Sequence, residues 1–583
     1  MVIIGISFTH DGTITIVRDG KVAFAIGEER LNRRKSYIGF PFEGLRYVIA
    51  EKIITPSEVS LIAIAAGTFS KQWARTFALE LTEDKKYYDF QNEKQPGDFF
   101  LNDDEWKSIK TDGECRLYVE KKIRELFNAQ GITAPIKYYK HHLCHAASAY
   151  WSNEHPQALA ITLDGEGDSA SGSVAICNNG SINTLIEFPA ESSIGYLYSA
   201  VTQELGFKTS RHEGKITGLA AYGNPDVTRA HFEREVQVKN GVITFGRAAS
   251  WRRIVSRIKA KLHIHRYYVN FWQEIVGEAG IVSKEDLSAG VQYILEKRVT
   301  ELVDHWVKKT GISNIVTAGG ILANVKLNQR IAELASVASF RVHPDMGDGG
   351  NAYGAAMLAY QEHYPDARPS LMSTVYFGPE YSDDAIEQIL RAESLVSFKK
   401  SNSIAADAAQ YIADGKIIGW FQGRMEYGPR ALGNRSILAC ATDKTINTWL
   451  NERMKRTEFM PFAPSCLAEA AHEVFIIPKE SMVIPARFMT ITFNVKDAWA
   501  PKVAAITHVD GTARPQLVRK EDNPLYHELL SAYRVKTGLP LCINTSFNVH
   551  EEPIICAPEQ ALRALTNDVI DVLAIGSFIV EKK

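Results

Sequence analysis

A strand-and-turn pattern occurs twice in the chain and limits its fold more than any other feature. Three β-branched runs within residues 2–26 are separated by Asp-Gly turns, the first of them Asp11-Gly12. Three more runs within residues 158–186 are interrupted by Asp164-Gly165 and Asn179-Gly180. The repetition predicts a duplicated half, although hairpin signals alone leave two unrelated meanders open. The predicted strands are Val2–Ser7, Thr13–Val17, Lys21–Ile26, Ala158–Leu163, Gly172–Cys177 and Ser181–Ile186.

Duplicated halves of this kind build the actin-like ATPase fold, in which the first turn of each half faces a nucleotide phosphate. The 583 residues of the chain are too many for one hydrophobic core and should form about three or four domain-sized units. Breaks at Arg368-Pro369-Ser370 and Gly378-Pro379 predict a boundary near residue 375. We therefore expect an α/β chain, with a duplicated domain over residues 1–374 and a second α/β domain over residues 375–583.

The remaining segments give weaker signals. We expect a helical stretch from about Phe42 to Asn128, in which the polar and aromatic part Tyr87–Asp104 forms an insertion or lid. The run Ile315–Gly320 predicts a strand that ends in a glycine turn, followed by a helix that begins near Leu322. Further predicted elements are helices over Asn351–His363 and Asp383–Glu393, and strands over Ile417–Phe421, Met489–Phe493 and Leu541–Asn544.

Charge and cysteine usage exclude several classes of protein. The chain has 66 Lys and Arg against 68 Asp and Glu, a formal charge of −2. It lacks the basic field that holds a polyanion, so we expect no nucleic-acid partner. Its seven cysteines form no CxxC pair, which argues against a disulfide framework or a thiolate zinc site. Without a basic leader region or an apolar run of about 18 residues, we expect a cytoplasmic protein and no membrane segment.

Two histidines predict a metal site. His141 and His145 are four residues apart, so a helix presents both imidazoles on one face. Asp164 and Asp168 lie in the turn of the second strand unit, and Asp348 lies in another glycine-rich turn, so these residues would supply carboxylates. A mixed histidine and aspartate set suits Fe, Mn or Zn better than a soft copper site. The alternative is that the histidines are helix caps or hydrogen-bonded core residues.

Three glycine-rich turns predict a nucleotide site, because each brings backbone N–H groups close to a ligand. They are Gly165 to Asp168, Gly319-Gly320 before a helix, and Gly347 to Gly350 before another. Lys215 stands alone in a stretch of small residues. That stretch is either close helix packing or a place where a lysine contacts a phosphate or a bound carbonyl. His10, in the turn after the first strand, is a candidate general base for a substrate hydroxyl.

An arginine-rich segment marks the second domain. Gly423–Ser436 contains Arg424, Arg430 and Arg435 among glycines. Because arginine binds phosphate oxygens through two N–H groups, the segment suits a polyphosphate or an acyl phosphate. A solvated basic surface and a nucleic-acid patch are the alternatives, and Tyr427 is the single stacking aromatic within the motif. Further polar candidates around the same pocket are Lys455, Arg456, Arg514, Asn544, Ser546 and Asn548.

Taken in order, these motifs resemble the O-carbamoyltransferase family of NodU, CmcH and TobZ. The matching segments span nearly the whole chain: Thr9–Gly12, Glu28–Arg30, His141–His145, Leu163–Gly165, Glu213–Gly223, Gly319-Gly320 with Asn324, Gly347-Asp348, Gly423–Ser436, Pro461–Pro464, Thr507–Arg514 and Asn544–Asn548. The resemblance implies an N-terminal domain similar to TsaD, on the actin-like fold, and a C-terminal domain similar to YrdC. The second would form carbamoyl adenylate and pyrophosphate from carbamoyl phosphate and ATP. The first would pass the carbamoyl group to a substrate hydroxyl.

The resemblance also implies roles for residues and cofactors. A divalent metal, iron before manganese or zinc, would bind His141, His145, Asp164 and Asp348, and Mg²⁺ would accompany ATP. The adenylate would contact Gly165, Asp168, Gly319, Gly320 and Asn324. The catalytic set would be His10, Lys215 and Arg430, and the sites for carbamoyl phosphate and ATP would include Arg424, Arg430, Arg435, Lys455, Arg456, Arg514, Asn544, Ser546 and Asn548. The acceptor would be a small molecule with a hydroxyl group, and a homodimer stays open.

Two other functions compete with this interpretation. One is a fused enzyme that forms threonylcarbamoyladenosine in tRNA, which the near-neutral charge disfavours. The other is an actin-like small-molecule kinase or a nucleotide-regulated binding protein, which leaves the arginine-rich domain and the histidine pair without a role. The segments Lys71–Glu105 and Arg252–Lys261 match none of the shared motifs, and we expect them to shape the acceptor pocket.

Overall fold

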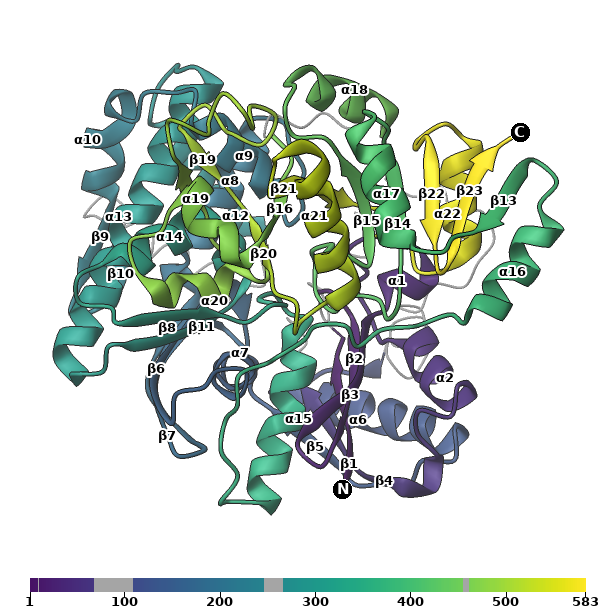
Figure 1. The fold of residues 1–583 in the computed structure, drawn as a ribbon. Helices are drawn as coiled ribbons and strands as arrows, with labels where there is room; N and C mark the ends of the chain where they lie inside the picture. Colours follow the sequence, from purple (N-terminus) through teal and green to yellow (C-terminus); the bar gives the residue numbers. More distant parts are fainter. Residues whose placement is uncertain (9, 68–107, 246–265, 455–460) are drawn as a thin grey trace.

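The computed structural model describes residues 1–8, 10–67, 108–245, 266–454 and 461–583. Two sheets of five strands form its N-terminal part (Figure 1), and they share one strand order. The first has the order β3-β2-β1-β4-β5 and the second β8-β7-β6-β11-β12. In each sheet three antiparallel strands are followed by two parallel ones. This equivalence confirms the duplicated half, and the chain has the α/β class that was predicted.

The strands of the two sheets agree closely with the sequence pattern, apart from β4, β5 and β12, for which no strand was predicted. They are β1 (Val2–Ser7), β2 (Thr13–Arg18), β3 (Lys21–Gly27), β4 (Val59–Ala65) and β5 (Ile136–Tyr139), then β6 (Gln157–Gly167), β7 (Ala170–Asn178), β8 (Ser181–Pro189), β11 (Asn314–Ala318) and β12 (Ser339–Val342). The sequence predicted helix throughout residues 42–128, so β4 is a correction. Leu61 to Ala65 are buried without alternation, and a continuous apolar run does not distinguish a buried parallel strand from a buried helix.

Two helices lie between the sheets and pack against each other. Helix α7 (His141–Trp151) covers the second sheet, and α15 (Gly350–His363) covers the first (Figure 1). Their approach is close because small residues meet there. A Cβ atom added at Gly354 would overlap the carbonyl oxygen of Cys144 in α7, and one added at Gly5 in β1 would overlap that of Ala352 in α15. Backbone therefore packs on backbone at both contacts.

Helical layers surround these sheets. Beside the first sheet lie α1 (Glu29–Asn32), α2 (Phe42–Ala50) and α6 (Asp112–Ala129). After β8 the chain forms α8 (Ile194–Glu204), α9 (Glu213–Ala220), α10 (Asp226–Glu235), the hairpin β9 (Val236–Lys239) with β10 (Val242–Phe245), α12 (Arg266–Gly277), α13 (Lys284–Thr310) and, after β11, α14 (Val325–Glu333). In the parts of the chain that the structure describes, none of the helices is both long and apolar enough to cross a membrane.

The C-terminal part contains a sheet of eight strands in the order β13-β23-β22-β14-β15-β21-β16-β20. These are β13 (Val396–Lys400), β14 (Ile418–Phe421), β15 (Arg435–Ala439), β16 (Pro464–Leu467), β20 (Gln516–Val518), β21 (Leu541–Ser546), β22 (Val572–Ile575) and β23 (Phe578–Lys582). A small sheet adds β17 (Phe475–Ile476), β18 (Phe493–Val495) and β19 (Thr512–Ala513). The helices are α16 (Asp383–Ala392), α17 (Ile404–Ala413), α18 (Thr445–Arg453), α19 (Ala471–Val474), α20 (Val483–Ala486), α21 (Pro524–Thr537) and α22 (Pro558–Thr566).

One predicted strand of this part is wrong. The sequence pattern predicted a strand over Met489–Phe493, but β18 begins only at Phe493. Met489 has a φ of 55°, and this left-handed conformation is incompatible with an extended strand. Residue 375 lies in the segment that joins α15 to α16, and the division of the chain there stays a prediction.

The contact between α7 and α15 yields the first testable prediction. We expect Gly354→Ala to lower the free energy of unfolding by about 1–3 kcal/mol, because the new Cβ forces the two helices apart. Gly113→Ala, in α6, is the matched control, since nothing lies within 4 Å of its added Cβ. The control should stabilise the chain by about 0.4–1 kcal/mol. Urea unfolding of the two variants measures both effects, and equal stability would contradict the close packing.

Candidate functional site

Four side chains converge at the N-terminus of α7. His141 and His145 project from one face of that helix, Asp164 comes from β6, and Asp348 comes from the turn before α15. The two histidine Nε2 atoms are 3.0 Å apart. Each of them lies 3.2 Å from Asp164 Oδ2 and 3.3 Å from Asp348 Oδ1. All four ligand atoms lie within 4.8 Å of one another.

This arrangement fits a divalent cation. Two ligand atoms that each lie about 2.1 Å from one ion are separated by about 3.0–3.4 Å, which is the spacing between the histidine nitrogens and their neighbours. The two carboxylates also favour a positive charge beside them, either a bound cation or a protonated histidine. Burial opposes protonation of His141, but Asp348 and Asp164 outweigh it and raise the pKa of His141 to about 9. Burial likewise opposes ionisation of Asp164, and hydrogen bonds from His141 and His145 hold the pKa of that carboxyl well below its usual range.

The neighbouring histidine does not join the cluster. His142 points elsewhere, and its ring nitrogens contact Thr162 Oγ1 at 3.2 Å and the carbonyl oxygen of Ala170 at 2.9 Å. The spacing of four residues therefore selects the pair that shares one helix face. The structure brings the four predicted residues together, and their role as metal ligands stays a prediction.

Glycine turns hold Asp164 in place. Its Oδ2 faces the histidines, while its Oδ1 accepts hydrogen bonds from the N–H groups of Gly165 at 2.7 Å and Gly320 at 3.1 Å. Gly319 has a φ of 112°, and a Cβ there would overlap the carbonyl oxygen of Leu163. Glycine is therefore required at position 319. Two residues predicted to contact an adenylate, Gly165 and Gly320, thus donate to one metal-ligand candidate, and a third, Gly319, lies against the residue before it.

Two further predicted adenylate contacts have structural partners. Asp168 Oδ2 accepts hydrogen bonds from the N–H of His141 at 2.8 Å and of Gly67 at 2.9 Å, so it holds the first residue of α7. Asn324 caps α14 through the N–H of Leu327. Its Nδ2 donates to Gln292 Oε1 at 2.8 Å, and Gln292 also accepts from the hydroxyl of Tyr198. No motif in the sequence points to Gln292 or Tyr198, which lie in separate helices.

The turn that contains His10 adjoins the cluster from the first half. Asp11 Oδ2 lies against Gly347, the residue before Asp348. Burial, with repulsion from Glu29 and Asp348, outweighs the opposing charge of His10 and raises the pKa of Asp11 to about 6. The turn therefore stands beside the metal-ligand candidates. Lys215, on α9, is buried, and its Nζ lies 5.6 Å from the centre of the Phe207 ring.

The three arginines of the segment 423–436 have different surroundings. Arg435 is fully buried, and its terminal nitrogens donate to the carbonyl oxygens of Gln422, Asn434, Pro379 and Gly423. Arg424 donates to the carbonyl oxygens of Gly378, Phe377 and Ala23. These contacts assign both guanidinium groups to holding the loop. Their predicted binding of phosphate stays untested.

Arg430 differs from both. It is half-buried, and it makes no hydrogen bond or ion pair with any residue that the structure describes. Burial lowers the pKa of its guanidinium to about 10, which leaves the group charged at neutral pH. A charge that is removed from water without an ionic partner is costly, and such a group suits an anionic ligand.

Three of the remaining candidates of the second part, Asn544, Ser546 and Asn548, lie on β21 or directly after it. Asn544 Nδ2 donates to Ser465 Oγ at 2.8 Å and Gln516 Oε1 at 3.0 Å. The hydroxyl of Ser546 donates to Asn548 Oδ1 at 2.6 Å. Arg514 directly follows β19. Lys455 and Arg456 lie outside the described residues, as do the segments 71–105 and 252–261 with the lid predicted over Tyr87–Asp104.

The arginine-bearing loop contacts the N-terminal part next to the cluster. Arg30 Nη2 donates to the carbonyl oxygen of Gly428 at 3.0 Å, and Gly428 lies against Asp345. The hydroxyl of Tyr427 is 3.2 Å from His343 Nε2. His343 and Asp345 belong to the segment that leads to Asp348, so the two candidate sites are neighbours in space.

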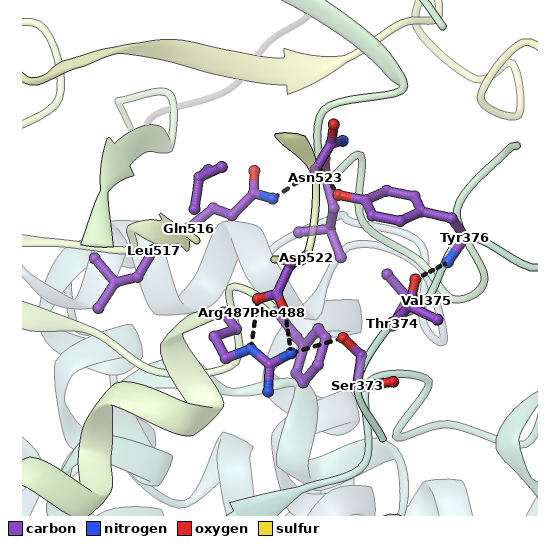
Figure 2. Close-up of a pocket in the computed structure, with 12 residues that line it drawn as sticks. Ser373, Thr374, Val375, Tyr376, Arg487, Phe488, Gln516, Leu517, Asp522 and Asn523 are labelled. Atoms are coloured by element: carbon purple, nitrogen blue, oxygen red, sulfur yellow. Dashed lines mark hydrogen bonds and ion pairs between the residues drawn. The ribbon is translucent and has the colours of Figure 1, made fainter. Parts of the chain in front are cut away.

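A small cavity lies elsewhere, between the segment 373–376 and the C-terminal sheet (Figure 2). Arg487 and Asp522 face each other in its wall, with two N–H···O contacts of 2.8 Å. The cavity has a volume of about 10 Å³, room for roughly one water molecule. It is too small for a substrate, and none of the predicted site residues lines it.

Two sequence families match the chain, "Carbamoyltransferase N-terminus" over residues 2–357 and "Carbamoyltransferase C-terminus" over residues 409–582. The nodulation protein NolNO of Sinorhizobium fredii is 34% identical, over 99% of this chain and 80% of its own length. The nodulation protein NolO of Bradyrhizobium diazoefficiens is 35% identical, over 76% of this chain and 79% of its own. The uncharacterized protein sll1178 of Synechocystis is 29% identical, over 100% of this chain and 96% of its own length.

A solved structure, the activator of the 2-hydroxyisocaproyl-CoA dehydratase from Clostridium difficile, aligns at 14% identity with a TM-score of 0.32. The alignment covers 63% of this chain and 96% of that one. The shared strand order of the two halves defines the fold here, not this alignment.

The position of His141 gives a second testable prediction. A Cβ added at Gly167 would overlap the His141 ring, whereas one added at Gly165 has only Tyr196 nearby, at 3.7 Å. We expect Gly167→Ala to push the imidazole out of the cluster and to weaken Mn²⁺ binding about 10-fold or more, although no ligand is replaced. Gly165→Ala should bind as the parent does. Calorimetric titration of the chelator-treated proteins measures both, and unchanged binding in Gly167→Ala would contradict the proposed ligand set.

Proposed function

The chain belongs to the carbamoyltransferase family, and on that premise we propose that it transfers a carbamoyl group from carbamoyl phosphate to a hydroxyl of a small molecule, with ATP as the activating co-substrate. The convergence of His141, His145, Asp164 and Asp348 is the observation that supports this most directly. The acceptor is a secondary metabolite or a glycan. The relatives NolNO and NolO are named for nodulation, which fits such an acceptor.

The proposal divides the work between two domains, residues 1–374 and 375–583, the second of them YrdC-like. The two family matches, which end at residue 357 and begin at residue 409, support the division. The reaction in the second domain needs one water to balance. Carbamoyl phosphate and water give carbamate and phosphate, and a carbamate oxygen then attacks the α-phosphorus of Mg²⁺-bound ATP. The bond to the β-phosphate breaks, which releases pyrophosphate and leaves carbamoyl adenylate.

Arg430 is the residue that this step requires most. It holds a full charge without an ionic partner among the described residues. A guanidinium in this state binds phosphate oxygens and stabilises the charge that develops while the α-phosphorus is attacked. Arg514, Ser546 and Asn548 would contact the same substrates. Arg424 and Arg435 shape the loop through their contacts with carbonyl oxygens.

The second step takes place in the first domain. A divalent cation, iron or else manganese or zinc, held by His141, His145, Asp164 and Asp348, would polarise the carbamoyl carbonyl when bound. His10 accepts the proton of the acceptor hydroxyl, whose oxygen attacks that carbonyl while AMP leaves. The nucleotide would lie against the backbone of Gly319 and Gly320, where the absence of side chains permits a close approach, and would contact Asn324 and Lys215.

Pyrophosphate release tests the whole proposal. Mixing the protein with ATP, Mg²⁺ and carbamoyl phosphate should release pyrophosphate, and mass spectrometry should then detect carbamoyl adenylate. ADP as the product would instead support a small-molecule kinase. A requirement for bicarbonate and threonine would support the tRNA-modifying enzyme. If neither pyrophosphate nor carbamoyl adenylate is formed, with or without a panel of acceptor alcohols, the proposal is contradicted.

The division of roles gives a third testable prediction. Arg430→Ala should slow adenylate formation by about 100-fold or more, yet it should still transfer carbamoyl from supplied carbamoyl adenylate. His141→Ala should show the reverse pattern. Arg519→Ala is the control. Arg519 is already paired with Asp522 at 2.6 Å, so this substitution should leave the rates of both steps unchanged.

Each half-reaction is measured separately, by pyrophosphate release and by AMP release from carbamoyl adenylate. Loss of both half-reactions in both variants would contradict the assignment of one step to each domain.

A further inference from the structure

Asn351 is a buried amide at the edge of the metal-ligand candidates. It lies in the first turn of α15, three residues after Asp348, and is 1% exposed. Its Nδ2 is 3.3 Å from His145 Nε2. Its Oδ1 is buried and has no hydrogen-bond partner among the residues that the structure describes. Sequence patterns do not single out this residue, because an asparagine near a helix start is usually a cap.

The surroundings of His145 Nε2 show why this amide matters. Four polar atoms lie within 3.3 Å of that nitrogen: His141 Nε2, Asp164 Oδ2, Asp348 Oδ1 and Asn351 Nδ2. An imidazole nitrogen has either one hydrogen or one lone pair, so it cannot form hydrogen bonds to all four. Atoms that share one cation are expected at this spacing, about 3.0–3.4 Å. Asn351 Nδ2 lies 3.3 Å from His145 Nε2, the same distance as Asp348 Oδ1, which would bind the ion.

The carboxamide oxygen and nitrogen of Asn351 can exchange places. The oxygen and nitrogen of an asparagine differ by half a turn of the carboxamide and are assigned from their hydrogen-bond partners. As placed, the donor Nδ2 faces a nitrogen whose lone pair a cation would use, while the acceptor Oδ1 meets no donor. Half a turn brings the oxygen to the ligand position instead.

We propose that Asn351 supplies its carboxamide oxygen as a fifth ligand to the cation held by His141, His145, Asp164 and Asp348. This inference rests on the metal site of the proposed function and extends it. Five protein ligands exceed the four of a tetrahedral zinc site. Hard oxygen ligands in an expanded shell suit Mn²⁺ or Fe²⁺ better than Zn²⁺. Asn351 therefore sets the preference of the site among divalent ions.

Metal binding to the chelator-treated protein tests this directly, by calorimetric titration with Mn²⁺ and, separately, with Zn²⁺. Asn351→Leu should weaken Mn²⁺ binding about 10- to 100-fold and Zn²⁺ binding much less. Asn351→Asp keeps an oxygen ligand and should restore Mn²⁺ binding. Asn351→Ala, which adds no bulk, serves if the leucine variant does not fold.

Two controls separate the possible failures. Asn328→Leu removes another buried amide, one that donates to the carbonyl oxygens of Leu322 and Thr490, and it should leave both affinities unchanged. His145→Ala should lose both metals. Parental Mn²⁺ affinity in Asn351→Leu and Asn351→Ala, or an equal loss for both metals, would overturn the role of Asn351. Failure of the parent to bind either metal would overturn the proposed metal site as well.

Discussion

The geometry of the candidate metal centre depends on the contact between α7 and α15. Helix α7 carries both histidines, and the turn before α15 carries Asp348. Each helix covers one of the two sheets, so the distance between the helices also sets the distance between the halves. Glycine at position 354 lets the two backbones meet, since any side chain there would strike the carbonyl oxygen of Cys144. Packing between backbones thus places ligands that are more than two hundred residues apart in sequence.

Duplication explains why acidic turns meet at this point, and burial explains why they differ. Asp11 follows β1, and Asp164 lies near the end of β6, the strand that corresponds to β1 in the second half. Hydrogen bonds from His141 and His145 favour the charged form of Asp164. Burial, with Glu29 and Asp348 nearby, disfavours the charged form of Asp11 and raises its pKa to about 6. The carboxyl groups at these corresponding strand ends therefore have pKa values that their neighbours shift in opposite directions.

Local patterns in the sequence were sufficient where the chemistry is local. Spacing of four residues selected His141 and His145 and left out His142, and turn signals located the first three strands of each half. Local patterns failed where burial by segments distant in the sequence decides whether a segment forms a strand or a helix. The run that forms β4 is apolar at nearly every position, and only its place between β1 and β5 makes it a strand. Sequence also cannot show whether an arginine donates to backbone, as Arg435 does, or has no hydrogen-bond partner among the described residues, as Arg430 does.

Contacts between the two parts of the chain carry a further electrostatic consequence. Arg33 donates to the carbonyl oxygens of Pro553 and Ile554, both at 2.7 Å, and Arg424 donates to that of Ala23 at 2.9 Å. Carbonyl oxygens hold a guanidinium in place but carry no net charge, so these contacts do not neutralise the arginines. With Arg430, these guanidinium groups place positive charge at the boundary between the parts, where Glu552 and Glu29 act on Arg33 and Glu380 acts on Arg424. An anionic adenylate at that boundary would meet both the guanidinium groups and these carboxylates, so the local arrangement of charges, and not the net charge of the chain, would decide how strongly it is attracted.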